Sequence, residues 1–219
     1  MVKLNKTPLR EGLTIKSEKD YQDGEIFKLL MDDCYHKCYI CEQRPRSPEV
    51  EHRIAHRGDI KLIFDWNNIF YACRHCNKIK NQKRFYGGII NPLVTDPEEC
   101  IELRMSYDNL REKVVLVKKV KDDALVDVTV DLLDLVHNNV STDNSRESAC
   151  NLRKKISDNL SVFLMYIKHY KEEQSIGDYY NIIEEISIDS EFAAFKRQMI
   201  KDDPGLLAVF SKNLEGAIK

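Results

Sequence analysis

The central segment reads VEHRIAHRGDIKLIFDWNNIFYACRHCNKIK from residue 50 to residue 80. It ends in a C-x-x-C pair, and 31 residues separate this pair from an earlier one, so that four cysteines are paired: Cys38, Cys41, Cys73 and Cys76. Two such pairs can close a tetrahedral thiolate cage around Zn²⁺. A cage without an open position is structural, so we expect zinc to join the two ends of the loop 42–72. The alternatives are a thiol-redox pair and unpaired structural cysteines.

The cysteine content also indicates a cellular compartment. Seven cysteines are an odd number, and the pairing of four of them argues against a secreted disulfide framework. We therefore expect a reducing, cytoplasmic location. The N-terminus has no apolar run of signal-peptide length, and there is no run of about 18 apolar residues that could span a bilayer. We assign no chemistry to the remaining cysteines, which are Cys34, Cys100 and Cys150.

Positive charge is concentrated in one part of the chain. The whole chain carries a formal charge of −2, which by itself points to no polyanionic partner. Residues 37–86 nevertheless contain eleven Lys and Arg against five Asp and Glu, an excess of six that leaves −8 for the rest. This segment is suited to meet phosphate, and a solvated basic face is the plainer alternative.

The chain of 219 residues is long enough for one large domain or two small ones. Helical spacing over 25–37 predicts a helix that leads into the first cysteine pair. A Gly-Gly pair, followed by Asn-Pro and Asp-Pro steps, indicates a boundary near residue 95. We therefore predict a zinc-containing module over 1–95 and a mainly helical accessory domain over 96–219.

The second part is expected to hold a small antiparallel sheet followed by helices. Short runs of β-branched and apolar residues predict strands at about 101–107, 113–119 and 125–130. Residues 145–171 read as one amphipathic helix, and two or three more helices are expected over 177–217. The apolar stripe of the long helix consists of Leu152, Ile156, Leu160, Phe163, Leu164 and Ile167. The predicted fold class is therefore α+β.

The order of residues around the cysteine pairs resembles that of the HNH endonucleases. Their pattern has C-x-x-C, an acid-His pair, an Asn, a second C-x-x-C with His or Asn directly after it, and a Lys three positions on. The corresponding residues here are Cys38, Cys41, Glu51, His52, Asn68, Cys73, Cys76, Asn77 and Lys80. The chain departs from the pattern at Glu51, where Asp is common, and at Asn77, where His names the family. The resemblance implies a zinc-stapled ββα-metal module with endonuclease activity.

The residue types fit the hydrolysis of a phosphodiester bond. This reaction needs an activated water, a counter-charge for the transition state and stabilisation of the leaving oxygen. One Mg²⁺ or Mn²⁺ ion can supply the last two, and its oxygen ligands would come from Glu51 and Asn77. His52 is expected on the other face of a strand from Glu51, and because the unperturbed pKa of histidine lies near neutrality, we expect it to be the general base.

The resemblance gives Asn68 the role of fixing the hairpin and orienting this histidine. Lys80 is expected to meet a phosphate, and further nucleic-acid contacts are expected from Arg53, Arg57, Lys78 and Lys83. Rival bases or phosphate binders are His56, His75 and His36. Taken singly, an acid-His pair is more often a solvated surface pair, and Asn77 could simply cap a helix.

Longer blocks resemble the PtuB-type HNH proteins of Septu anti-phage systems, including those attached to retrons. The blocks are KLLMDDCYHKCYICE, the segment from the acid-His pair to CNKIKN, NPLVTDPEE and VTVDLLDLVHNN. The similarity implies a bacterial defence effector that is controlled by a companion PtuA-like ATPase, with the helical half as docking surface. In retron versions it implies a reverse transcriptase and its RNA-linked DNA as further partners.

The substrate and two other function classes stay open. Double-stranded DNA, single-stranded DNA and a structured RNA such as tRNA all carry the phosphate on which the expected chemistry acts. A non-catalytic zinc-knuckle adaptor would bind nucleic acid or protein without hydrolysis. An assembly protein would act through its helical half, with a zinc module that merely folds.

Overall fold

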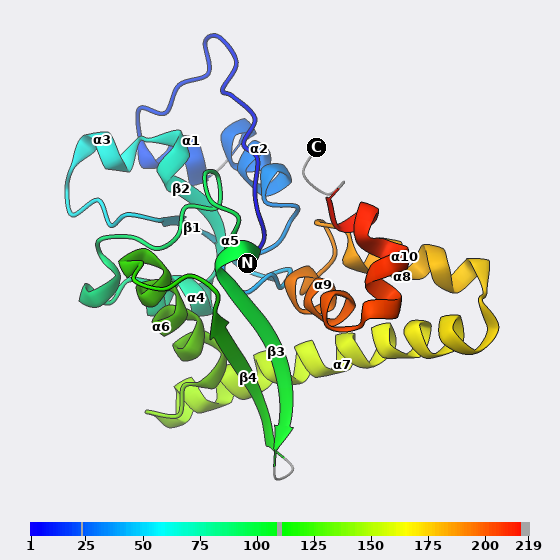
Figure 1. Cartoon of the computed structure of the whole chain (residues 1–219). Helices are drawn as coiled ribbons and strands as arrows, with labels where there is room; N and C mark the ends of the chain where they lie inside the picture. Colours follow the sequence, from blue (N-terminus) through cyan, green and yellow to red (C-terminus); the bar gives the residue numbers. More distant parts are fainter. Residues whose placement is uncertain (23, 109–110, 216–219) are drawn as a thin grey trace.

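The central segment folds into a short antiparallel hairpin with a helix directly after it (Figure 1). The computed structural model describes residues 1–22, 24–108 and 111–215. Strand β1 (Pro48–His52) pairs with β2 (Ile69–Cys73). Helix α4 (Arg74–Lys80) starts where β2 ends and packs on both strands. Helix α2 (Glu25–Asp33) leads toward the first cysteine pair, as expected, and also packs on β2, whose residues are all buried.

Two of the three strands expected in the second part are present. Strands β3 (Ile101–Asp108) and β4 (Arg111–Lys118) form a separate antiparallel pair directly after α5 (Pro97–Cys100). The strand expected at 125–130 is wrong, because these residues belong to helix α6 (Ala124–Asn138). Shorter helical elements are α1 (Glu18–Gln22), α3 (Ile60–Ile63) and 3₁₀ turns at Trp66–Asn68 and Lys83–Phe85. The structure is therefore a mixed α+β fold with two small sheets in the described residues.

Helix α6 forms because its N-terminal cap and its buried face both suit a helix. The Asp123 carboxylate accepts hydrogen bonds from the backbone N–H groups of Leu125 and Val126, which the first helical turn leaves without partners. Its buried side chains recur at helical spacing: Val126, Thr129, Leu132, Leu133, Val136 and His137. The β-branched residues that suggested a strand thus lie on a helix face that is turned to the core.

The C-terminal part is helical, as expected. Helix α7 (Asp143–Glu173) is the long amphipathic helix and runs along the lower side of the molecule in Figure 1. Five of its six expected stripe residues are buried, but Leu164 is 46% exposed. Three further helices follow: α8 (Ile176–Ile186), α9 (Ala193–Asp202) and α10 (Pro204–Glu215). Nowhere in the described ranges is a helix both long and apolar enough to cross a membrane.

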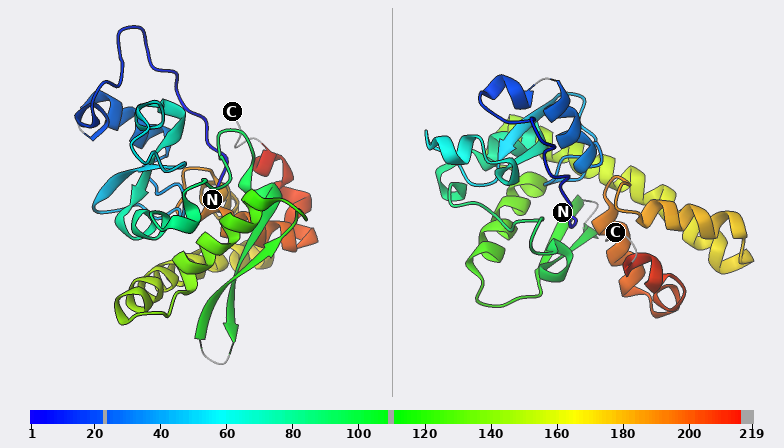
Figure 2. Two further views of the ribbon diagram at one scale, coloured as in Figure 1. Left: turned by 90° about the vertical axis from the view of Figure 1, so that its left-hand side faces the viewer. Right: turned by 90° about the horizontal axis from the view of Figure 1, so that it is seen from above.

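One hydrophobic core runs through both parts of the chain. Its buried residues extend from Met1 to Phe195 and lie on both sides of the boundary expected near residue 95. A second, smaller cluster joins the C-terminal half of α7 to the three helices that follow it. The right-hand view of Figure 2 shows these helices to one side of the hairpin.

A buried polar network joins the first cysteine pair to the loop between α8 and α9. The Lys37 ammonium donates to the backbone carbonyls of Ile188 and Ser190, at 2.6 Å each. The buried Glu42 carboxylate accepts a hydrogen bond from the backbone N–H of Ala194 at 3.2 Å. Since unpaired buried charges are costly, these contacts fix the cysteine-bearing loop against the helical part.

The buried His137 gives this core an expected dependence on pH. Burial lowers the pKa of His137 from 6.5 to about 4, and its Nδ1 lies 2.8 Å from the Leu133 carbonyl oxygen. The unfolded chain therefore takes up this proton at a higher pH than the folded chain, so stability falls as the pH drops from about 6.5 to about 4. From about pH 7 to about pH 5 we expect this residue to account for a loss of about 2 kcal/mol in the free energy of unfolding.

Urea unfolding of the zinc-loaded protein at both pH values measures this effect. The variant His137→Leu lacks the titrating group, so its unfolding free energy should fall less over the same interval. Zinc-ligand protonation contributes equally to both proteins and cancels in the comparison. An unchanged pH dependence in the variant would contradict the assignment.

Candidate metal centre and active site

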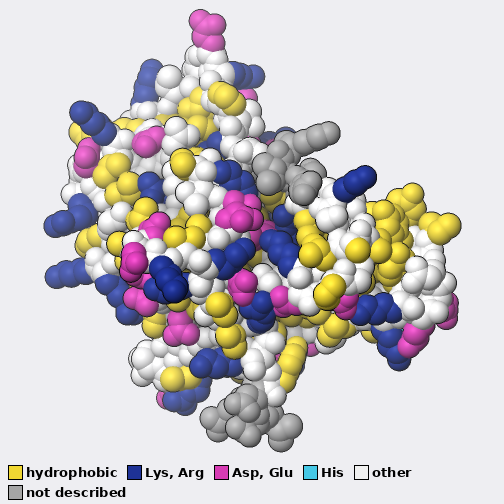
Figure 3. Space-filling model, in the orientation of Figure 1, with side chains coloured by type: hydrophobic (Ala, Val, Ile, Leu, Met, Phe, Trp, Pro, Cys, Tyr) yellow, Lys and Arg dark blue, Asp and Glu magenta, His cyan; other side chains and the backbone are white. Residues whose placement is uncertain are grey.

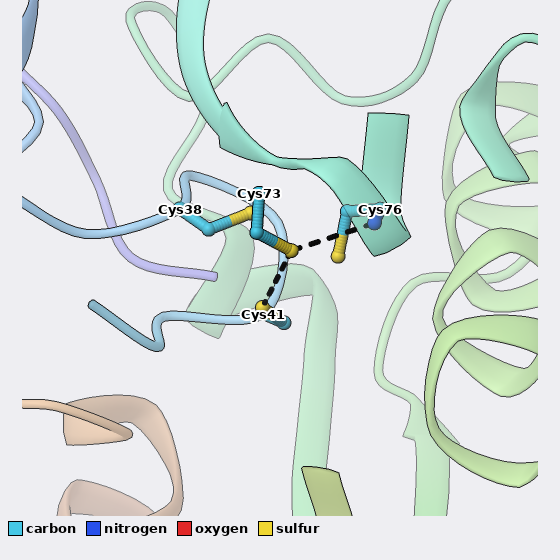
Figure 4. Close-up of side chains that lie close together, drawn as sticks. All are labelled: Cys38, Cys41, Cys73 and Cys76. Carbon is cyan, nitrogen blue, oxygen red and sulfur yellow. Dashed lines mark hydrogen bonds between the residues drawn. The ribbon is translucent and has the colours of Figure 1, made fainter. Parts of the chain in front are cut away.

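Two cysteines in the loop after α2 and two at the junction of β2 and α4 bring their side chains close together (Figure 4). Their Sγ atoms lie within 4.8 Å of one another and all four are buried: Cys38, Cys41, Cys73 and Cys76. The Sγ atoms of Cys41 and Cys73 are 3.8 Å apart, which is too far for a disulfide, and all four thiols are free. Four sulfur ligands at this spacing could hold a zinc ion, as expected.

Local backbone geometry brings these sulfur atoms together. Cys73 caps α4, and its Sγ accepts the backbone N–H of Cys76 at 3.4 Å and the side-chain amide of Gln43 at 3.2 Å. Hydrogen bonds lower the pKa of the Cys73 thiol, whereas burial raises the pKa of Cys41 and of Cys76. Four thiolates in a buried site need a positive charge, which a zinc ion would supply.

A cavity of about 660 Å³ lies along the edge of β1 that β2 does not cover. Its lining comes from α1, α2, β1, the loop after β1, and α4. The polar residues that line it include Glu49, His52, His56, Arg57, Asn77 and Asn81. Two of the residues expected in an active site, the histidine of the acid-His pair and the Asn after the second cysteine pair, thus share one cavity.

His52 is held at the end of β1 by the loop that follows it. Its Nε2 lies 3.1 Å from the Ile63 carbonyl oxygen, and its ring lies against those of Tyr21 and His56 at centroid distances of 5.8 and 4.8 Å. Because a carbonyl oxygen can only accept, a hydrogen bond to Ile63 requires the tautomer of the neutral ring that carries its hydrogen on Nε2.

Asn68 fixes that loop from inside. Its Oδ1 accepts the Ile54 N–H at 2.8 Å, and its Nδ2 donates to the carbonyls of Ile54 and Leu62 at 3.0 and 3.1 Å. The Asn68 carbonyl also accepts the N–H of Arg53 at 2.8 Å. These bonds tie together the two ends of the loop that carries the His52 contact, which fits the positioning role expected for Asn68.

Glu51 does not join His52 and Asn77 in the cavity. It is 1% exposed and forms an ion pair with Lys80 at 3.3 Å, and the Tyr39 hydroxyl donates to its Oε2. Burial raises the pKa of Glu51 despite this ion pair. Lys80 is also 1% exposed and faces Glu51, so the phosphate contact expected of it stays a prediction. The pair instead ties β1 to α4.

Glu49 is a carboxylate that lines the cavity together with Asn77. Its Oε2 accepts a hydrogen bond from Asn77 Nδ2 at 2.8 Å, and its side chain is 38% exposed. The Asn77 Oδ1 accepts from Asn81 Nδ2 at 3.1 Å. Glu49 was not among the residues expected in the site, although alternation along a strand places it on the same face as Glu51.

The residues expected to contact nucleic acid differ in their exposure to solvent. Arg57 lines the cavity and is exposed, with its guanidinium 5.8 Å from the centre of the Tyr86 ring. Lys78 and Lys83 are exposed, whereas the half-buried Arg53 donates to the Ile89 carbonyl at 2.9 Å. Lys and Arg side chains project from the side of the molecule where α3 lies (Figure 3). This side is suited to a phosphate backbone.

The rival histidines lie in three different settings. His56 lines the cavity beside His52, and its Nδ1 accepts the Gly58 N–H at 3.2 Å. His75 turns away to the Val136 carbonyl at 2.8 Å and so ties α4 to α6. His36 forms an exposed pair with Asp32 at 3.1 Å. Only His56 therefore stays a neighbour of the expected reaction centre.

No protein-family model matches the chain, and no curated protein matches its sequence. A function can therefore be proposed only from the order of the motif residues and the geometry of the cavity.

Proposed function

We propose that this protein is a metal-dependent HNH-type endonuclease that hydrolyses phosphodiester bonds in nucleic acid. The observation that carries the proposal is that His52 and Asn77 line one cavity while a four-cysteine cluster ties the loop before β1 to the junction of β2 and α4. Oxygen ligands from Asn77 and a carboxylate beside it fit a hard cation such as Mg²⁺ or Mn²⁺. The proposed module is of the ββα-metal type, built from β1, β2 and α4.

The chain's own residues supply the proton chemistry and the positioning. Nδ1 of His52 accepts a proton from the attacking water, and the Ile63 carbonyl stabilises the resulting imidazolium through Nε2–H. Asn68 holds the loop that carries this carbonyl, and Arg57 contributes a positive charge at the cavity for the phosphate. When bound, the divalent cation supplies counter-charge for the transition state and for the leaving oxygen.

The biological setting of the proposal follows from the resemblance to PtuB-type proteins. In it the nuclease is a cytoplasmic effector of a Septu or retron-associated anti-phage system. A PtuA-like ATPase controls it, and in retron versions a reverse transcriptase with its RNA-linked DNA joins the assembly. The helical part formed by α7, α8, α9 and α10 would offer the docking surface for these partners.

A cleavage assay tests the nuclease with and without its genomic neighbours. Wild type and His52→Ala would be incubated with phage DNA, plasmid, single-stranded DNA and total cellular RNA, in Mg²⁺ and then in Mn²⁺. Loss of a general base is expected to slow cleavage by about 10²- to 10⁴-fold. His36→Ala is the matched control, because this exposed histidine lies outside the cavity and should leave the rate unchanged.

The same assay separates the nuclease from an adaptor. Cleavage by wild type and His36→Ala, with the rate lost in His52→Ala, would support the proposal and identify the substrate polymer. Absence of cleavage by folded, zinc-loaded wild type with all partners present would shift the function to a non-catalytic binding module, whereas equal cleavage rates for wild type and His52→Ala would show that His52 is not the general base.

A further inference from the structure

The acid of the acid-His pair lies in a poor position to bind a cation in the cavity. Glu51 is 1% exposed, and Lys80 stands 3.3 Å from its carboxylate. If Glu51 turned toward a cation, it would leave the Lys80 ammonium buried without its counter-charge, and breaking such a pair is costly. A cation beside Glu51 would also be repelled by that ammonium.

Glu49 has the properties that Glu51 lacks. It lies two residues earlier on β1, so both carboxylates are on the face of the hairpin that α4 covers. Glu51 meets Lys80, whereas Glu49 meets Asn77, which lies about one turn earlier on α4. Glu49 lines the same cavity as His52 and is partly open to solvent. Its one cationic neighbour among the described ion pairs is Arg74, which is 83% exposed and 3.9 Å away.

We infer that Glu49, and not Glu51, supplies the carboxylate of the divalent-cation site, together with Asn77. This inference rests on the proposed nuclease function and specifies its metal site. In the present arrangement Asn77 turns its Nδ2 to Glu49, and half a turn of the amide places Oδ1 there instead. Two oxygen donors then stand side by side at the cavity wall, as Mg²⁺ and Mn²⁺ require.

Binding of Mn²⁺ to the zinc-loaded full chain tests the inference without nucleic acid and without turnover. Electron paramagnetic resonance reports free Mn²⁺, and isothermal titration gives the same affinity independently. Because losing a charged ligand weakens a hard-cation site, Glu49→Gln is expected to raise the Mn²⁺ dissociation constant by at least about tenfold. Asn77→Ala should weaken binding in the same direction.

The matched control removes the other carboxylate together with its partner. The double variant Glu51→Gln/Lys80→Met leaves no buried unpaired charge, so it should fold and bind Mn²⁺ within about threefold of wild type. Thermal melts run alongside separate binding from stability, since a merely structural Glu49–Asn77 contact would lower the melting temperature and leave Mn²⁺ affinity unchanged.

Each outcome decides the inference. Weaker Mn²⁺ binding in Glu49→Gln with affinity kept in the double variant would support it. The reverse pattern, or a Glu49→Gln protein that binds as wild type does, would overturn it while leaving the nuclease proposal intact. No Mn²⁺ binding by wild type would also overturn it, and the cleavage assay would then judge the nuclease separately.

Discussion

Removing zinc is expected to unfold the hairpin region and to loosen the helical part with it. The four Sγ atoms lie within 4.8 Å in a buried site, and the loop that bears Cys38 and Cys41 carries the Lys37 and Glu42 contacts to the residues before and within α9. Structural zinc contributes about 10 kcal/mol or more to the folding of small zinc domains. Loss of the metal should therefore shift the thermal melt to much lower temperature or abolish its cooperativity.

Circular dichroism melts, with zinc content measured on the same samples, test this expectation. A strong chelator and the variant Cys73→Ser should have the same effect, since each leaves the site incomplete. Cys150→Ser is the matched control, because Cys150 is exposed and lies outside the cluster. A zinc-free protein that melts where the loaded protein does would show that the cluster is four buried thiols without a structural metal.

The parts of this structure that were predictable are those with local signals. The cysteine cluster could be predicted from spacing along the chain, because two C-x-x-C pairs are typical of a four-cysteine zinc site. Helix α7 follows from its 3.6-residue period, which a 31-residue helix repeats many times. The error at 125–130 had a tertiary cause, since the packing of α6 outweighs the strand preference of Val and Thr.

The candidate site was predictable only to the level of its segment. Alternation places Glu49 and Glu51 on one strand face, but it does not say which turn of α4 each of them meets. That depends on how α4 packs across the hairpin, which sets Lys80 beside Glu51 and Asn77 beside Glu49. The acid-His motif identifies two residues in the sequence. Whether the carboxylate is buried depends on how the core packs, which the motif does not predict.

The continuity of the core across residue 95 likewise has no local signal. Gly, Pro and Asp around that position are typical of a linker, and Gly87 and Pro92 do lie in turns, whereas Asp96 and Pro97 begin α5. What joins the two parts is a set of contacts between distant residues, such as Lys37 with the Ser190 carbonyl. We therefore expect the segment 1–95 on its own to be less stable than the full chain, because it would expose the surface that the helices cover.

Glu51→Gln is expected to destabilise the protein by about 3 to 5 kcal/mol, the usual cost of removing one partner of a buried ion pair. The change leaves the Lys80 ammonium 1% exposed without its counter-charge. For a chain of this length the melting temperature should fall by roughly 6 to 20 °C. Asp127→Asn is the matched control, since the Asp127–Lys118 pair is about half exposed and such pairs contribute about 1 kcal/mol or less.

A double-mutant cycle with Lys80→Met separates the pair from its surroundings. Lys80→Met removes the positive charge beside a carboxyl whose pKa burial already raises, so Glu51 should bind a proton in the folded state. Glu51 then holds a proton in the folded chain that it lacks in the unfolded chain, so the variant should lose stability relative to wild type as the pH rises from about 5 to about 8. The double variant should recover most of the loss and follow the same pH dependence as wild type, because neither charge of the pair remains while the other titrating groups are unchanged. Additive losses in the cycle would mean that Glu51 and Lys80 act independently and that the tie between β1 and α4 lies elsewhere.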